Sequence, residues 1–176
     1  NCFALRLEVL RPLHPMLIVL PLGLLSMAVV FDIVQLLTRN NTFSIVAYWN
    51  IAAGVVTGLL AATAGLRDWI AIPGGTRAKT VGALHGLGNL IVVVLFAVSW
   101  WMRRDSLDYV PDTLAFFLGL VAFAIVGFTG WLGGELVYRL RVAVDDGANL
   151  DAPSSLSKKP VMPLDVTPET EPAARR

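Results

Sequence analysis

Four long, apolar and almost uncharged stretches constrain this chain more than any other feature. They cover approximately residues 13–37, 45–66, 80–102 and 113–140. Each reaches the ~20 residues that an α-helix needs to cross ~30 Å of hydrocarbon. Helix is the expected conformation because lipid offers no hydrogen-bond partner to an unpaired peptide group, and the alternating segments of a transmembrane barrel are missing. The sequence therefore predicts an all-α bundle of four transmembrane helices.

Composition predicts one membrane domain flanked by polar ends. Apolar residues make up 56% of the chain and charged residues 15%, and the charges gather between the apolar stretches. Short connectors containing Pro73-Gly74-Gly75 and Pro111-Asp112 predict an up-down-up-down order. The expected organisation is an N-terminal segment at 1–12, a four-helix transmembrane domain at 13–144 and a tail at 145–176. Because few large apolar groups occur in the tail, it is predicted to be disordered.

Basic residues predict the orientation of the bundle. On the side that holds the start of the first helix, the second connector and the end of the fourth helix lie Arg6, Arg11, Arg67, Arg77, Lys79, Arg139 and Arg141. The opposite side has Arg39, Arg103 and Arg104. The positive-inside rule therefore places both termini in the cytoplasm. The first stretch is interpreted as a retained helix rather than a signal peptide, because no small-residue cleavage site follows it.

Several classes of function are disfavoured. The basic residues are scattered over loop ends, so a nucleic-acid partner is not expected. Cys2 is the single cysteine, which excludes an internal disulfide or a cysteine metal cage within a monomer. No serine has the nucleophile-elbow pattern of hydrolases, and enzymatic activity is not expected. The expected surroundings are the lipid bilayer and, through helix faces or the tail, membrane-protein partners or further copies of this chain.

The predicted threading brings together ionisable residues that are far apart in the sequence. His14, Asp68, His85 and Glu135 all fall in the cytoplasmic half of the bundle, and they include both histidines of the chain. Ionisable groups at membrane depth are costly and face the bundle interior, so this cluster is the candidate functional site. His14 and Asp68 are expected near the interface, with His85 and Glu135 ~7–9 Å deeper. Each residue also has a purely structural interpretation, as a cap, a solvated charge or a hydrogen-bonded side chain.

Polar residues in and around this cluster are expected to have specific partners. Asp32 lies ~27 Å from His14 along the first helix and is therefore outside the cluster. Asn89 is one helical turn from His85, on the same face. The expected partners are Arg39 or Arg103 for Asp32, Arg77 or Arg139 for Glu135, and a group on a neighbouring helix for Asn89.

Small residues recur at the spacing that lets helices pack closely in lipid. They form one stripe in each of the last three helices: Gly54, Gly58, Ala61 or Ala62, and Gly65; Gly82 and Gly86; and Gly127, Gly130 and Gly134. We expect these stripes to serve helix packing rather than ligand binding.

The ordered set of motifs resembles the bacterial membrane family known as domain of unknown function 2231. The matching stretches are His14-Pro15 with Pro21-Leu22-Gly23, Asp32, Trp49 with Ala53-Gly54, Gly65 to Trp69, Lys79 to Asn89, and Gly133 to Tyr138. The family pattern after the tyrosine tends toward a glycine-valine repeat, whereas this chain continues with Arg139 to Val144. The resemblance implies a multi-pass protein of the bacterial inner membrane and carries no established activity.

Three functional hypotheses follow. The first is a structural or accessory subunit of a membrane assembly, in which the polar cluster fixes helix register. The second is a redox subunit, either with His14 and His85 as axial ligands of haem b or with a divalent metal held by His14, Asp68, His85 and Glu135. The haem version requires a tilt or break of the first helix near Pro15, because the two histidines are expected at different depths. The third is translocation of protons or small solutes, using Asp32 and the cluster as a relay.

Overall fold

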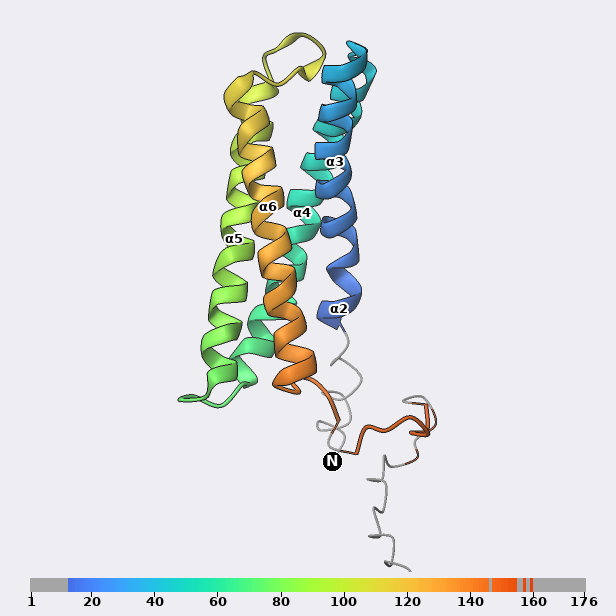
Figure 1. The fold of residues 1–176 in the computed structure, drawn as a ribbon, viewed down its shortest axis with the longest axis vertical. Coiled ribbons are helices and arrows are strands. Elements are labelled where there is room, and N and C mark those ends of the chain that lie inside the picture. Colours follow the sequence, from blue (N-terminus) through green and yellow to red (C-terminus); the bar gives the residue numbers. More distant parts are fainter. Residues whose placement is uncertain (1–12, 146, 155–156, 158, 160–176) are drawn as a thin grey trace, which may run out of the picture. The chain divides into compact units, whose positions relative to one another are not determined.

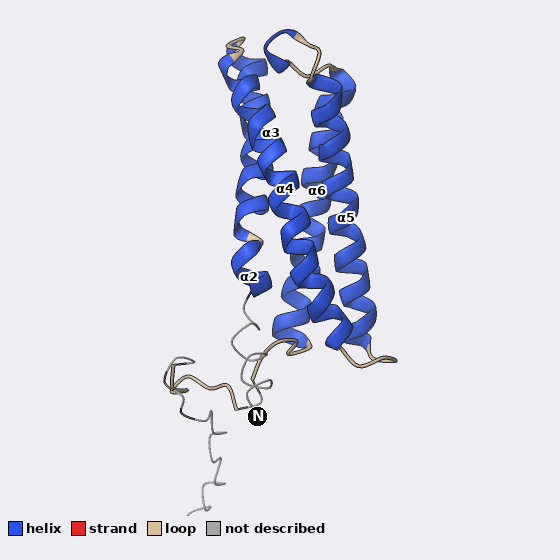
Figure 2. Ribbon diagram, turned by 180° about the vertical axis from the view of Figure 1, so that it is seen from behind, coloured by secondary structure: helices blue, strands red, loops and turns tan. Residues whose placement is uncertain are grey.

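The computed structural model describes residues 13–145, 147–154, 157 and 159. It divides into two units, residues 1–143 and 144–176. In the first unit, the described residues form a bundle of four long helices that alternate in direction, with no strand (Figures 1 and 2). This confirms the all-α, four-helix prediction. The described residues of the second unit form turns; the segment at 1–12 and most of the tail, including its predicted disorder, lie outside the described residues.

The first membrane crossing consists of two consecutive helices, α2 (Leu13–Leu17) and α3 (Val19–Thr38). Pro21 has no backbone N–H, so the carbonyl four residues before it loses its helical partner and the ladder is interrupted at Ile18. The helical path continues, because Ile18 N donates to His14 O and Leu22 N donates to Ile18 O. The two helices cover the stretch expected at 13–37, and the interruption lies at Ile18 rather than near Pro15.

The second and third crossings are longer than the apolar stretches that predicted them. α4 spans Thr42–Ala71 and α5 spans Arg77–Arg103, against expected ranges of 45–66 and 80–102. At ~1.5 Å per residue α4 is ~45 Å long, so its ends extend beyond the hydrocarbon layer. Thr76 caps α5 by accepting a hydrogen bond from Lys79 N at 3.2 Å. The additional residues at the helix ends can be polar, because these ends lie outside the hydrocarbon layer.

The fourth crossing begins as an α-helix and ends as a π-helical turn. A 3₁₀ turn at Leu107–Tyr109 leads to α6 (Thr113–Gly134), where Asp112 Oδ1 accepts from Ala115 N at 2.7 Å. The last turn, η2 (Glu135–Arg139), is a π-helix. Together α6 and η2 span Thr113 to Arg139, against the expected range of 113–140, and the last turn is wound more widely than an α-helix.

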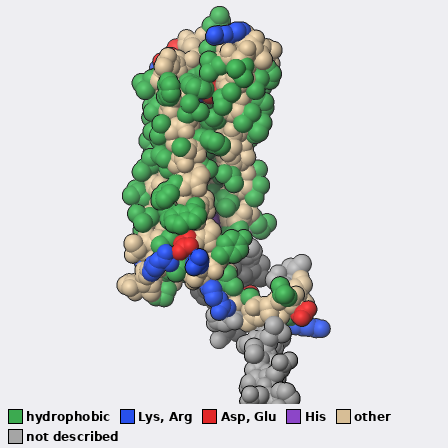
Figure 3. Space-filling model, viewed as in Figure 1, with side chains coloured by type: hydrophobic (Ala, Val, Ile, Leu, Met, Phe, Trp, Pro, Cys, Tyr) green, Lys and Arg blue, Asp and Glu red, His purple; other side chains and the backbone are tan. Residues whose placement is uncertain are grey.

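The four crossings form a square in cross-section. α3 packs along α4 and α5 along α6, while α4 also packs against α5 and α3 against α6. α3 and α5 therefore face each other diagonally. The buried core is apolar and extends from the middle of the bundle toward the end where α3 meets α4: Leu25, Ala28, Val29, Ala47, Ile51, Val92, Phe96 and Ala122. The outward side chains are also mostly apolar (Figure 3), as expected of a bundle whose solvent is lipid.

Only some of the predicted small-residue stripes lie at helix contacts. On α4 the prediction is confirmed, because a Cβ at Gly54 would lie 2.5 Å from Leu25 and one at Gly65 would lie 2.9 Å from His14. The α6 stripe is wrong for Gly127 and Gly130, where a Cβ would meet no atom of another residue within 4 Å, and Gly86 of α5 is equally open. The close approach between α5 and α6 instead uses Gly88 and Gly133. Spacing alone could not distinguish the lipid face from the packed face.

Candidate functional site

His14 lies at the start of α2 and is fixed against α4. Its Nδ1 is 3.1 Å from the carbonyl oxygen of Ala61. Because a carbonyl oxygen only accepts, Nδ1 carries a proton, and in the neutral ring Nε2 then has the lone pair. Gly65, one turn after Ala61, leaves room for the ring, since a Cβ there would lie 2.9 Å from His14 Cε1. The α4 surface therefore both anchors the imidazole and accommodates it.

His85 lies on α5 and is fixed in the same way against α6. Its Nδ1 donates to the carbonyl oxygen of Thr129 at 2.8 Å. Asn89 Nδ2 lies 3.1 Å from His85 Nε2, and Asn89 Oδ1 accepts from the Thr129 hydroxyl at 3.0 Å. Gly133 makes room, because a Cβ there would lie 3.2 Å from His85 Cε1. The expected contact of Asn89 across helices is therefore confirmed.

The two imidazoles meet in the space between the diagonally opposed crossings. Their ring centroids are 6.4 Å apart and their planes are nearly perpendicular, at 87°. The expected difference in depth along the helices does not separate the rings. Both side chains have Nδ1 bound to a backbone carbonyl, and both are half-buried. The structure thus assembles a pair of anchored imidazoles from residues 71 positions apart.

The two carboxylates of the predicted cluster are placed differently. Glu135 Oε1 accepts from Arg77 Nη2 at 2.6 Å, which confirms one of the two predicted partners. Asp68 is half-buried near the end of α4. Within the part of the chain that the structure describes, there is no group of three or more His, Cys, Asp and Glu residues that could hold a metal ion. The predicted four-residue metal set is therefore not brought together; its two histidines are.

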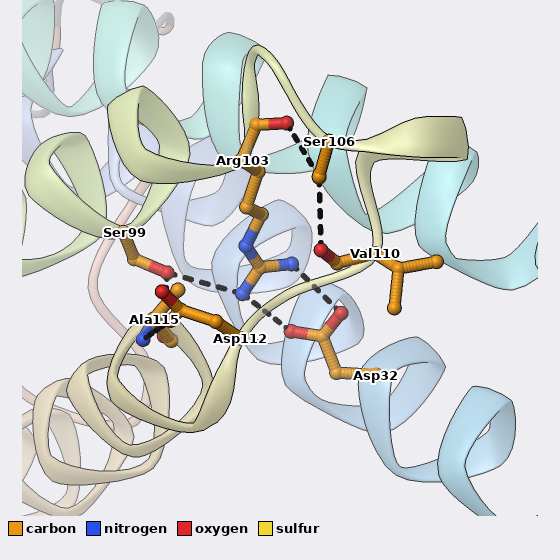
Figure 4. Close-up of polar contacts among 7 residues, drawn as sticks. All are labelled: Asp32, Ser99, Arg103, Ser106, Val110, Asp112 and Ala115. Carbon is orange, nitrogen blue, oxygen red and sulfur yellow. Dashed lines mark hydrogen bonds and ion pairs between the residues drawn. The ribbon is translucent and has the colours of Figure 1, made fainter.

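Asp32 lies at the opposite end of the bundle and is paired with Arg103, as predicted. Arg103 Nη1 and Nη2 donate to the two carboxylate oxygens at 2.8 and 2.7 Å (Figure 4). Arg103 Nη2 also lies 3.0 Å from Ser99 Oγ, and that hydroxyl donates to Ala115 O at 2.7 Å. Asp32 and Arg103 are 2% and 1% exposed, so the pair is sealed inside the protein. We call this region the Asp32 end and the region around His14 the His14 end.

Sequence reasoning missed two residues that shape the His14 end. Thr129 supplies both the carbonyl that anchors His85 and the hydroxyl that orients Asn89. A polar residue within the apolar α6 was the available signal. Lys79 was counted only as a basic loop residue, yet its Nζ donates to Trp69 O at 2.7 Å and lies 4.0 Å from the centre of the Trp69 ring. This contact joins residues on either side of the α4–α5 loop, so it produces no periodic pattern in the sequence from which it could have been predicted.

Fold and composition together define the class of protein. All four crossings are long and apolar enough to span a membrane. Asp32 and Arg103, the buried charged residues in the described part of the chain, form an ion pair with each other. This is a multi-pass helical membrane protein. The chain belongs to the family described as predicted membrane protein (DUF2231), whose model matches residues 10–146. Neither the curated proteins nor the solved structures include a match.

Proposed function

We propose that this protein is an electron-transfer subunit of the bacterial inner membrane that binds haem b, with His14 and His85 as the axial ligands. The distance between the two rings carries the proposal. An axial nitrogen lies ~2 Å from its metal, and ring bonds of about 1.33 Å put that nitrogen roughly 1.1 Å from the ring centre. Two imidazoles on one iron therefore have ring centres roughly 6.2 Å apart, and the observed separation is 6.4 Å.

The hydrogen bonds of the two rings support the same assignment. Metal-bound histidines almost always donate their second ring nitrogen to a carbonyl or carboxylate, which fixes the tautomer and ring orientation. His14 and His85 both make this bond, to Ala61 O and Thr129 O. Each leaves Nε2 as the nitrogen with a lone pair. Asn89 must release His85 Nε2 for a metal to bind there, and the Thr129 hydroxyl can hold the displaced amide by its oxygen.

The charge at this end of the bundle also suits an anionic group. Gly65 and Gly133 let the two imidazoles pack closely against α4 and α6. Arg67 and Arg139 are exposed at the His14 end, so positive charge is available for carboxylate groups at that surface. A haem with two nitrogen ligands would supply one-electron transfer. The protein's own part is to orient both imidazoles and to hold them within an apolar bundle.

A structural or accessory subunit is the second candidate. It is favoured by the fact that His14, His85 and Glu135 already have hydrogen-bond partners within the bundle. A ring separation of 6.4 Å also falls in the about 4.5–7 Å range of an ordinary edge-to-face ring pair. In that case the hydrogen bonds of the histidines serve to fix helix register, and the helix faces contact other membrane proteins or further copies.

An absorption spectrum combined with metal analysis tests these candidates. The protein would be expressed with haem available, purified in detergent and scanned in its oxidised and reduced forms. We expect a strong haem band that is lost in His14→Ala and His85→Ala, with circular dichroism confirming that both variants remain helical. Asp68→Asn is the matched control, because Asp68 belongs to the predicted four-ligand metal set but not to the histidine pair. A colourless wild-type protein without bound metal would support the structural candidate.

Transport is less well supported than either candidate. The transport hypothesis uses Asp32 as part of its relay, but Arg103 binds both carboxylate oxygens of Asp32 in a buried position. A proton or ion would have to displace a fully formed ion pair. Flux into liposomes that disappears in Asp32→Asn would revive the transport hypothesis.

A further inference from the structure

The Asp32 end contains an unusual set of buried polar atoms. In the described residues, four buried side-chain atoms lack a hydrogen-bond partner, and all of them lie at this end of the bundle: Gln35 Oε1, Ser44 Oγ, Trp100 Nε1 and Arg103 Nε. Gln35, Ser44 and Arg103 are 4%, 0% and 1% exposed. Buried polar atoms in proteins are normally hydrogen-bonded, and each exception calls for a physical cause. Four exceptions at one end indicate that a partner belongs there.

These atoms belong to one connected region. Arg103 is joined to Asp32 by two hydrogen bonds, and Gln35 lies one turn after Asp32 on α3. Gln35 Nε2 donates to Asn41 Oδ1 at 3.3 Å, and Ser44 follows Asn41 by three residues. Trp100 precedes Arg103 by three residues on α5, so both lie on the same helical face. The four residues therefore lie at the same end of the bundle, on α5, α3 and the start of α4.

The chemistry of the four atoms restricts what can bind them. Trp100 Nε1 and Arg103 Nε are donors, Gln35 Oε1 is an acceptor, and the Ser44 hydroxyl can be either. A bare cation would repel the donors and a bare anion would repel the acceptor, and the charges of Asp32 and Arg103 already balance. The partner must be small, neutral, and both donor and acceptor.

We propose that the Asp32 end is a site for bound water molecules that hydrogen-bond Arg103 Nε, Trp100 Nε1, Gln35 Oε1 and Ser44 Oγ. Internal waters typically make about three hydrogen bonds to buried polar groups that are otherwise unsatisfied. These waters hydrate the ion pair and thereby offset the cost of burying two charges at membrane depth.

The Ser44→Ala substitution tests this proposal, because bound water and an unpartnered hydroxyl predict opposite changes in the midpoint of thermal unfolding. A truly unpartnered buried hydroxyl is unfavourable and alanine is the better helix former, so Ser44→Ala would then raise the midpoint of thermal unfolding. If water binds the hydroxyl, the variant leaves that water short of a partner, and we expect the midpoint to fall by about 2–4 °C. Ser26→Ala is the matched control, since Ser26 is half-buried on α3 and makes no side-chain hydrogen bond within the described residues. Its midpoint should stay the same or rise.

An experimental structure provides the second, independent measurement. At a resolution that shows ordered water, we expect density within hydrogen-bond distance of Arg103 Nε and Gln35 Oε1. Dry, fully packed surroundings of these atoms would overturn the proposal, as would a raised midpoint for Ser44→Ala. Neither experiment involves the histidine pair, so its outcome is separate from that of the haem proposal.

Discussion

The Arg103 guanidinium binds the Asp32 carboxylate in a two-pronged geometry, with both N–O distances below 3 Å and neither side chain accessible. The pair links α5 to the diagonally opposite α3. Removing one member of a buried pair leaves an uncompensated charge, which costs about 3–5 kcal/mol. We therefore expect Arg103→Met or Asp32→Leu to lower the free energy of unfolding by about this amount, measured by denaturant titration in detergent. The double variant Asp32→Leu/Arg103→Met should recover much of the loss. Additive losses would contradict the coupling between the two side chains.

The Arg77–Glu135 pair at the His14 end should behave in the opposite way. Its N–O distance is 2.6 Å, but the Arg77 side chain is 62% exposed. An exposed pair loses side-chain entropy and is screened by salt, so it contributes about 0–1 kcal/mol. We expect Arg77→Gln to change the free energy of unfolding by less than about 1 kcal/mol, and the difference to shrink further in high salt. A loss comparable to that of Arg103→Met would show that Glu135 is held in a far less polar environment.

Sequence reasoning predicted the crossings and several partners for identifiable physical reasons. Apolar length fixed the four spans, because lipid enforces helix over at least ~20 residues. The threading of those spans placed Arg103 opposite Asp32 and Arg77 near Glu135. The meeting of His14 and His85 could not be derived in the same way, since it depends on helix tilt and on the interruption at Ile18, which no periodic pattern records. The roles of Thr129 and Gly133 depend on the rotation of α6, which is apolar on nearly every side.

Gly65 is expected to be essential for the position of His14. A methyl group at residue 65 would lie 2.9 Å from Cε1 of the ring and 3.1 Å from Nδ1, so the imidazole must move and strain its bond to Ala61 O. We expect Gly65→Ala to destabilise the protein by about 1–3 kcal/mol, the usual cost of overpacking. Gly86→Ala is the control, because a methyl group at that position would meet nothing within 4 Å. It should be neutral or stabilise by up to about 1 kcal/mol through helix propensity. Equal effects at the two sites would argue against the contact.

The hydrogen bonds of the histidines predict their tautomers in the absence of a ligand. Nδ1 donates to Ala61 O in His14 and to Thr129 O in His85, while His85 Nε2 accepts from Asn89. Nitrogen NMR of ¹⁵N-histidine-labelled protein should therefore show Nδ1 protonated in both rings. Asn89→Leu should alter the Nε2 resonance of His85 and leave that of His14 in place. A wild-type ring that carries its proton on Nε2 and none on Nδ1 would contradict these hydrogen-bond directions.

The orientation of the bundle can be tested with single cysteines placed in opposite loops. Basic residues predict that the α4–α5 loop faces the cytoplasm and that the α5–α6 loop faces the other side. Cys2 would first be replaced by serine, so that each variant has one thiol. Gly74→Cys and Asp105→Cys both place that thiol at an exposed position outside the long helices. A membrane-impermeant maleimide added to cells with a permeable outer membrane should label Asp105→Cys at once and Gly74→Cys only after lysis. The reverse pattern would place the His14 end outside, and equal labelling of both variants in intact cells would mean that the bundle inserts in both directions.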